Sequence, residues 1–235
     1  KDKGEGVMFC YHPHGIVPMG FSINGAVRAR SLGAVGEFLP KEVPLCEEAN
    51  GVQAAILFKM PFLCAVLNLF GCATPATKEG MRGLLARRET FGIVVGGSED
   101  VSIHECGKEN LYIRKRAGFI KYGLQQGYRL MVVYSFGEND LYRSAASLRG
   151  VNEFLVSRFG FVLPVFCGRW WCPLLPRGGV PLNTVVGGVL QLPKIENPTG
   201  EDVEKYHKLY MLELENVFNA YKERFGYGDR KLNLM

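Results

Sequence analysis

Residues 7–15 read Val-Met-Phe-Cys-Tyr-His-Pro-His-Gly, an apolar run that stops at two histidines on either side of a proline. Residues 7–11 predict a short buried strand, and residues 15–32 predict a helix that Gly33 would end. A buried strand that leads directly into a helix is the building unit of an α/β fold. The stretch therefore predicts a largely parallel or mixed sheet, with the histidine pair just beyond a strand end.

The remainder of the chain repeats this alternation of strands and helices. Extended segments are predicted at residues 71–75, 91–95, 130–136 and 184–189, and helices at residues 54–69, 78–88, 117–126 and 141–159. Residues 98–110 are predicted to form a polar loop. The clearest helix follows Thr199, placed as its N-cap with Asp202 three residues on. His207 lies off the apolar stripe of this helix and is expected to be solvated.

The composition fits one domain over residues 1–235 with a substantial core. Of the 235 residues, 47% are hydrophobic, and no linker, low-complexity run or internal repeat divides them. The net charge of +5 does not suggest a nucleic-acid partner; it suits an anionic small molecule or a phospholipid surface, and equally a slightly basic soluble protein. The seven cysteines contain no CxxC pair, so we expect buried free thiols and no metal site.

The longest apolar stretch, residues 54–73, is interrupted by Lys59, Pro61 and Asn68. Its uninterrupted part is too short to cross a hydrocarbon core about 30 Å thick. We expect a buried or interfacial helix there.

The histidine pair is the first candidate for catalysis. In an extended backbone His12 and His14 share a face, and Pro13 stiffens the turn between them. A helix that begins at Gly15 would disfavour an imidazolium near its N-terminus and keep His14 neutral, as a general base must be. We therefore predict His14 as the base and His12 as its orienter or a substrate contact.

Two other interpretations of the pair stay open at this point. The histidines could bond to backbone carbonyls in a purely structural role. They could also bind a metal with His104 and Cys106, although no zinc motif has this spacing.

A general base needs a partner, and the stretch IVVGGSED at residues 93–100 offers one. Glu99 or Asp100 could orient the histidine and stabilise its charged form. The backbone amides at Gly96 and Gly97 could receive an anion or a developing oxyanion. An ordinary turn with solvated acids is the alternative.

An anion site is indicated by the basic run in YIRKRAGFIKYG, residues 112–123. Arg114, Lys115, Arg116 and Lys121 stand at the start of a predicted helix, where the backbone amides add positive potential. Phosphates could be held there, although a solvated basic face has the same pattern.

Several stretches together resemble one family, the type-2 diacylglycerol acyltransferases with their monoacylglycerol and wax-ester acyltransferase relatives. The YHPHG run is similar to the family's signature motif, and VVGGSED to its Gly-Gly-x-x-Glu segment. FGCATPATKEG resembles its Pro-Val-Ser-Arg-Asp segment, and residues 113–140 resemble its block from Arg-x-Arg-x-Gly-Phe to Phe-Gly-Glu-Asn. The likeness extends from about residue 7 to residue 226.

The resemblance implies a function and a place in the cell. It implies acyl transfer from acyl-CoA, without a further cofactor, to the hydroxyl of a neutral lipid on a glycerolipid-acyltransferase-like α/β fold. Diacylglycerol is the expected acceptor; a monoacylglycerol or a fatty alcohol stays open, as does a homo-oligomer. The implied location is the endoplasmic reticulum membrane and the lipid droplet, with the catalytic part facing the cytosol. The family's N-terminal hydrophobic segments are not found in this chain.

The resemblance also implies site residues. They match the family's motifs at His12, His14, Gly96, Gly97, Asp100, Lys78, Arg114, Arg116, Glu138 and Asn139. Asp100 stands in place of the family's glutamate and Glu99 in place of a small residue, so either acid could face the histidine. Lys78 replaces an arginine and so loses the bidentate fork. The basic residues would hold the CoA phosphates.

Two rival functions remain at this stage. A thioesterase or hydrolase could use the same residues with water as the acceptor. A lipid-binding module would keep the histidines for structure alone. No Gly-x-Ser-x-Gly elbow is present, so we expect no acyl-enzyme.

Overall fold

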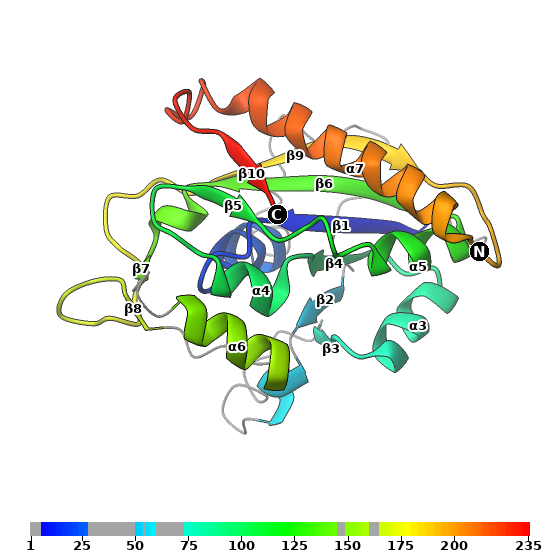
Figure 1. The fold of residues 1–235 in the computed structure, drawn as a ribbon, viewed down its shortest axis with the longest axis horizontal. Coiled ribbons are helices and arrows are strands. Elements are labelled where there is room, and N and C mark those ends of the chain that lie inside the picture. Colours follow the sequence, from blue (N-terminus) through cyan, green and yellow to red (C-terminus); the bar gives the residue numbers. More distant parts are fainter. Residues whose placement is uncertain (1–5, 28–49, 54, 60–72, 145–148, 160–164) are drawn as a thin grey trace.

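The structure is a computed structural model, and it describes residues 6–27, 50–53, 55–59, 73–144, 149–159 and 165–235 (Figure 1). Its centre is a six-stranded sheet with the order β3-β2-β4-β1-β6-β9. The strands are β1 (Val7–His12), β2 (Asn50–Gln53), β3 (Ala73–Pro75), β4 (Phe91–Val94), β6 (Arg129–Phe136) and β9 (Asn183–Gln191). The first five strands in this order run parallel, and β9 alone pairs antiparallel, with β6. The predicted mixed α/β fold is confirmed.

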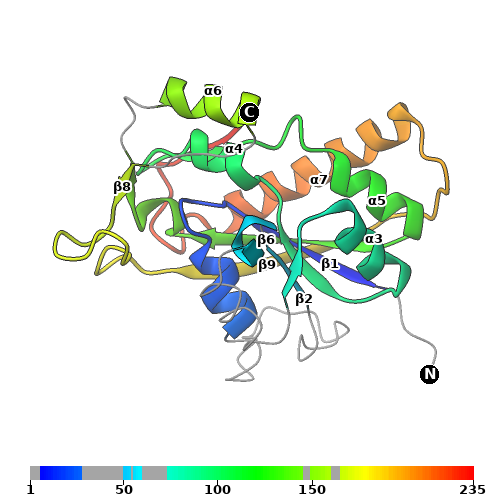
Figure 2. The ribbon, with the colours of Figure 1, turned by 90° about the horizontal axis from the view of Figure 1, so that it is seen from below.

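Helices cover both faces of the sheet. One face carries α3 (Lys78–Ala86), α5 (Gly118–Gln126) and α7 (Gly200–Tyr221), whose apolar side chains join those of the strands in the largest core cluster. The short π-helix η1 (Gly20–Val27), blue in Figure 2, lies on the other face. Both faces are thereby buried, as a mainly parallel sheet requires.

The alternation along β1 explains where its side chains point. Met8 and Cys10 belong to the cluster beneath α7, whereas Val7 and Phe9 pack on the opposite face with residues of β6. Since successive side chains of a strand alternate between the faces, His12 projects toward α7. The strand is buried on both sides, which is why it reads as a continuous apolar run.

Small elements surround the central sheet. They are η2 (Ala55–Lys59), α4 (Gly97–Ser102), η3 (Glu138–Asp140), α6 (Arg149–Phe159) and two two-stranded sheets. One of these sheets pairs β5 (Glu109–Leu111) with β10 (Leu232–Leu234), and the other pairs β7 (Arg143–Ser144) with β8 (Phe166–Cys167).

Several predicted elements are confirmed. Helix α3, helix α5 with its left-handed cap at Gly127, and strand β6 lie where the pattern puts them. Thr199 and Asp202 form the expected capping box of α7. Such caps are readable from sequence because they satisfy orphan amides within one turn.

Three predictions about elements are wrong. The helix after the histidines begins at Gly20 and not at Gly15, since Gly15 has a φ of +61°, in the left-handed region. Residues 98–110 are not a loop throughout, because α4 occupies Gly97–Ser102. Strand β7 and then α6 replace the single helix predicted at residues 141–159. Residues 28–49 and 60–72 lie outside the described residues, and so do the end of the helix predicted at residues 15–32 and most of the helix predicted at residues 54–69.

The cysteine prediction is correct only in part. Cys10, Cys106, Cys167 and Cys172 are free thiols, but only Cys10 is buried and Cys167 is exposed. The other three cysteines lie outside the described residues. Among the helices that the structure describes, none is long and apolar enough to cross a bilayer.

Candidate active site

The candidate site lies where three neighbouring strands end. Strand β1 pairs with β4 on one side and β6 on the other, all parallel, so their carboxyl ends meet at the same edge of the sheet. The loop that carries His14 therefore lies between the start of α4 after β4 and the η3 turn after β6. His14 thus lies just beyond the end of a strand, as the sequence predicts.

His14 presents a neutral imidazole at this edge. Its Nδ1 lies 3.1 Å from the carbonyl oxygen of Gly15, and because a carbonyl only accepts, Nδ1 carries the proton and donates. The other ring nitrogen, Nε2, then keeps its lone pair. Burial lowers the pKa of His14 below its usual value. The ring is therefore kept neutral by desolvation, and not by a helix N-terminus as the sequence suggested.

His12 has a different environment from His14. Its ring is buried against α7, and its Nε2 lies 2.7 Å from the hydroxyl of Tyr210. Burial lowers the pKa of His12 to about 3. Nδ1 of His12 has no hydrogen-bond partner in the described structure. The peptide bond between His12 and Pro13 is cis. The prediction that the two histidines share a face is wrong, since His12 contacts Tyr210 whereas His14 contacts the Gly15 carbonyl.

Asp100 holds the backbone of the histidine loop. One carboxylate oxygen accepts from the backbone N–H of His14 at 3.2 Å, and the other from the N–H of Tyr112 at 2.6 Å. The side chain is buried, and burial raises the pKa of Asp100 to about 7 against the opposing effect of the two hydrogen bonds. A Cβ at Gly96 would lie 1.8 Å from the Asp100 carboxylate, so only glycine fits beside it.

Glu99 points toward the basic run and not toward a histidine. Its Oε2 forms an ion pair with Nη2 of Arg116 and accepts from the Ser98 hydroxyl at 3.0 Å. The Nε of Arg116 is buried and has no hydrogen-bond partner among the described residues. Gly97, with a φ of +60°, turns the chain between these groups. Arg116 therefore lies next to the candidate site and keeps donor capacity.

Glu138 fixes the other side of the histidine loop. Its two oxygens accept from the backbone N–H groups of Met19 at 2.9 Å and Gly20 at 2.6 Å, at the start of η1. The side chain is buried, and burial raises the pKa of Glu138 to about 8. A Cβ at Gly20 would lie 2.1 Å from the hydroxyl oxygen of Ser135, which leaves no room for a larger residue. Glu138 thus positions the backbone after His14.

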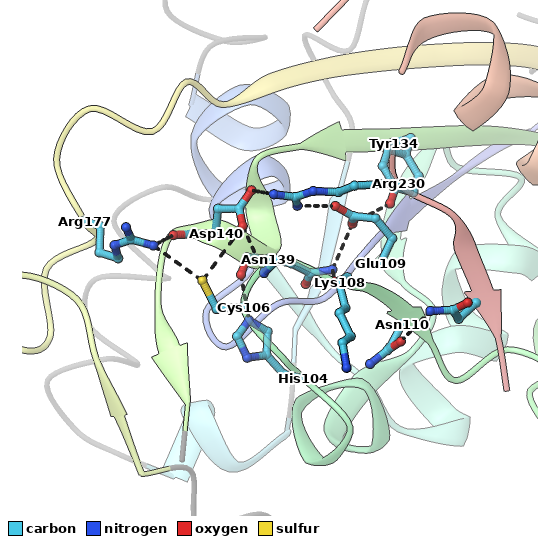
Figure 3. Close-up of polar contacts among 12 residues, drawn as sticks. His104, Cys106, Lys108, Glu109, Asn110, Tyr134, Asn139, Asp140, Arg177 and Arg230 are labelled. Atoms are coloured by element: carbon cyan, nitrogen blue, oxygen red, sulfur yellow. Dashed lines mark hydrogen bonds and ion pairs between the residues drawn. The ribbon is translucent and has the colours of Figure 1, made fainter. Parts of the chain in front are cut away.

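Asn139 belongs to a buried network beneath the site (Figure 3). Its side-chain amide nitrogen donates to the Lys108 carbonyl and to Glu109, each at 3.0 Å, and its backbone carbonyl accepts from Nε2 of His104. Arg230 bridges Glu109 at 2.8 Å and Asp140 at 2.9 Å. These contacts give Asn139 a structural role.

Two of the predicted substrate-binding residues lie away from these contacts. Arg114 donates from Nε to the carbonyl of Leu234 in β10 at 2.9 Å. Lys78 is the first residue of α3, after the edge strand β3, and its side chain is exposed. The structure brings neither into contact with His12 or His14. No three His, Cys, Asp or Glu side chains gather as possible metal ligands in the described part of the chain.

Sequence reasoning missed several residues of the site. Tyr210 stands on the apolar stripe of α7, which marked it as core but gave no sign of its hydroxyl reaching His12. The backbone amide of Tyr112 has no sequence signal at all. His207, predicted to be solvated, is buried with its ring nearly perpendicular to that of Phe119, because α5 packs against α7 there. The apolar stripe of α7 shows which face of that helix is buried by the sheet. It does not show that α5 also covers the side of α7 that carries His207.

The fold and site define an α/β protein with a neutral histidine and two buried carboxyl groups at one sheet edge. The family described as diacylglycerol acyltransferase matches residues 2–235. Diacylglycerol O-acyltransferase 2 of Dictyostelium discoideum is 35% identical over 94% of this chain and 67% of its own length. Diacylglycerol O-acyltransferase 1 of Eremothecium gossypii is 31% identical over 99% of this chain and 50% of its own length. Human diacylglycerol O-acyltransferase 2 is 32% identical over 93% of this chain and 57% of its own length. The chain belongs to the diacylglycerol acyltransferase family.

The chain spans half to two thirds of the length of these curated relatives. No solved structure matches it.

Proposed function

We propose that this chain is the catalytic domain of an acyl-CoA-dependent O-acyltransferase that acylates diacylglycerol to triacylglycerol. The relatives' names support acyl transfer to diacylglycerol. The observation that carries the mechanism is the neutral, partly exposed His14 at the carboxyl edge of the sheet, whose Nε2 has no hydrogen-bond partner among the described residues. We extend the proposal to a glycerolipid-acyltransferase-like fold.

His14 acts as the general base. Its Nε2 takes the proton of the acceptor hydroxyl while that oxygen attacks the thioester carbonyl, a contribution of roughly 10²- to 10⁴-fold. The new C–O bond forms, the C–S bond breaks, and the CoA thiolate leaves without a strong acid because its pKa is about 8.5 by analogy with cysteine. The proton on the imidazolium then passes to the thiolate or to solvent, which restores the neutral base.

The surrounding carboxyl groups position this base. Asp100 holds the His14 amide from one side and Glu138 holds the amides at the start of η1 from the other. His12, fixed by Tyr210, anchors the beginning of the loop. A base held at both ends of its loop keeps its geometry without spending binding energy on ordering.

The anionic parts of the reaction have candidates on the α4 side. The backbone amides at Gly96 and Gly97 would receive the oxyanion, each such donor mattering by about 3 kcal/mol. Arg116, held by Glu99, would meet the CoA phosphates first, with Arg114 and Lys78 farther along the donor's path. Asn139 would serve through the network that holds η3 in place. No cofactor besides acyl-CoA enters this scheme.

The proposed setting is a membrane surface. Diacylglycerol resides in lipid, so the enzyme would work at the endoplasmic reticulum membrane and the lipid droplet, with its catalytic part in the cytosol. A homo-oligomer is compatible with the scheme, and a nucleic-acid partner is not part of it.

The deciding experiment is CoA release from oleoyl-CoA by the protein on phospholipid vesicles. Diacylglycerol, monoacylglycerol, fatty alcohol or no acceptor is supplied in parallel reactions. Release that needs diacylglycerol supports the proposal, and release that needs another acceptor reassigns the substrate. Release without any acceptor indicates a hydrolase, and a folded protein without release in any reaction refutes the enzyme.

A further inference from the structure

Residues 165–179, here called the Trp hairpin, carry apolar side chains that the fold leaves uncovered. Trp170 is 89% exposed, Leu174 73% and Trp171 56%. They follow β8 on the yellow segment that projects from the domain in both Figure 1 and Figure 2. Large apolar side chains gathered at one exposed tip mark an interaction surface more often than side chains exposed singly.

The hairpin is a built structure with its own backbone hydrogen bonds. The N–H of Gly168 donates to the Pro173 carbonyl at 2.9 Å, and that of Arg169 donates to the Leu175 carbonyl at 3.0 Å. A Cβ at Gly168 would lie 1.7 Å from the Leu175 oxygen, so the two legs touch. The Tyr142 hydroxyl donates to the Leu174 carbonyl at 3.0 Å, which ties the hairpin to the domain. The exposed tip is therefore held in a defined shape.

Arg177 fastens the second leg of the hairpin to the turn below the candidate site (Figure 3). Its Nη1 donates to the Asp140 carbonyl at 3.1 Å and lies 3.4 Å from the sulfur of Cys106. Its backbone N–H donates to the Leu141 carbonyl at 2.8 Å. Asp140 ends the η3 turn that begins with Glu138, so the hairpin is attached next to the residues that hold the histidine loop.

The legs of the hairpin also pack against the histidine loop itself. Phe166 in one leg and Val180 just beyond the other join the apolar cluster of Ile16, two residues after His14. The tip therefore projects from the same end of the sheet as His14. Whatever binds the tip is brought close to the candidate site.

The charge of this region identifies the partner. No Asp or Glu occurs between Glu153 and Glu196, whereas the hairpin itself carries the basic residues Arg169 and Arg177. The guanidinium of Arg169 lies 5.7 Å from the ring centre of Trp171, and its Nε donates to the Pro176 carbonyl. Tryptophan prefers the interface between headgroups and acyl chains, and arginine beside it is attracted to anionic headgroups.

We infer that the Trp hairpin docks the protein on a lipid bilayer by placing Trp170, Trp171 and Leu174 in its interface. Docking at the tip would set the His14 end of the sheet against the membrane. The docking follows from the hairpin alone, whereas its use in delivering a lipid substrate rests on the proposed function.

The chain supplies its own reporter for the test. Its two tryptophans are Trp170 and Trp171, so tryptophan emission, excited where tyrosine does not absorb, reports only the tip. We would titrate the 235-residue protein with phosphatidylcholine vesicles and with vesicles that contain 30% phosphatidylserine, plain or brominated in the acyl chains. The inference predicts a blue-shifted emission, quenching by the brominated lipid, and tighter binding to the anionic vesicles that weakens with salt.

Two matched variants show whether the tip is the cause. Leu174→Ser keeps both tryptophans and is expected to weaken partitioning roughly tenfold, since burying one leucine is worth about 1.5 kcal/mol or more. Leu212→Gln removes an equally apolar side chain, 54% exposed on α7, and is expected to change partitioning less than twofold. The double variant Trp170→Ser/Trp171→Ser, followed by vesicle sedimentation, should lose most binding.

Three results would overturn the inference. They are unchanged emission with both kinds of vesicle, a blue shift that grows with protein concentration in the absence of lipid, and equal weakening by Leu212→Gln. The second would make the tip a contact between copies of the chain. Docking without any acyl transfer would leave the hairpin assignment intact and refute the proposed function. If Leu174→Ser weakens docking but leaves acyl transfer from vesicles unchanged, the hairpin assignment stands and its use in delivering the lipid substrate is refuted.

Discussion

Asp100 is expected to make the protein less stable as the pH rises from 5 to 8. Burial raises its pKa to about 7 from its usual value of 3.8, so the folded state binds the proton more tightly than the unfolded chain. The unfolding free energy then falls with pH wherever the folded state carries the extra proton. This contribution is present in full below the unfolded pKa and is lost as the pH passes the folded one.

The size of the effect follows from the shift. Each pKa unit corresponds to about 1.4 kcal/mol, so the contribution of Asp100 falls by about 3 kcal/mol between pH 5 and pH 8. Glu138, with its pKa raised to about 8, acts in the same direction. His12 and His104 act oppositely below pH 6.5, because burial lowers their pKa values to about 3 and about 4. The wild-type profile alone therefore does not isolate Asp100.

A difference measurement isolates this group. Urea unfolding of wild type and Asp100→Asn, followed by circular dichroism at pH 5, 6, 7 and 8, gives the difference in unfolding free energy at each pH. The asparagine adds an offset that does not depend on pH. The unfolding free energy of the wild type minus that of Asp100→Asn should therefore fall by about 3 kcal/mol from pH 5 to pH 8. Glu99→Gln, one residue away and paired with Arg116 near the surface, serves as the control. A difference that stays flat within about 0.5 kcal/mol, or rises with pH, would refute the assignment.

Tyr210→Phe should destabilise the protein by about 1–2 kcal/mol, because it leaves Nε2 of His12 buried without a partner; an unchanged urea midpoint would contradict the contact. Arg230→Met should lower the free energy of thermal or urea unfolding by about 3 kcal/mol, since buried Glu109 loses its counter-charge. A loss below 1 kcal/mol would mean that the hydrogen bonds from Tyr134 and Asn139 are enough to stabilise the Glu109 carboxylate. Thr199→Ala should cost about 1 kcal/mol by removing the α7 cap while acyl transfer stays within twofold of wild type, and a larger loss of activity would tie α7 stability to catalysis.

The sheet and its edge were predictable because their signals are local. The apolar runs of β1 and β6 and the glycines after the strands mark buried parallel strands and their ends. Parallel strands end at a common edge, so the approach of His14 to Asp100 and Glu138 followed from topology.

The hydrogen-bond partners within the site were not predictable. Asp100 and Glu138 bind backbone amides. Because nearly every residue has a backbone amide, the residue type does not show which amide will bind a carboxylate. The position of η1 depended on the backbone angle of Gly15, which permits a helix as readily as a turn. Burial of His207 came from the packing of α5 beside α7, a contact between segments distant in sequence.

The most direct test of the central claim is the kcat of acyl transfer to diacylglycerol for His14→Ala beside His12→Ala and Thr199→Ala. Thr199→Ala controls for a modest loss of stability away from the site, and unfolding curves accompany each variant. We expect His14→Ala to stay folded and to lose 10²- to 10⁴-fold in kcat with little change in the KM for acyl-CoA, whereas His12→Ala mainly loses stability. A folded His14→Ala protein that retains more than a tenth of the wild-type kcat would contradict the assignment of His14 as the general base.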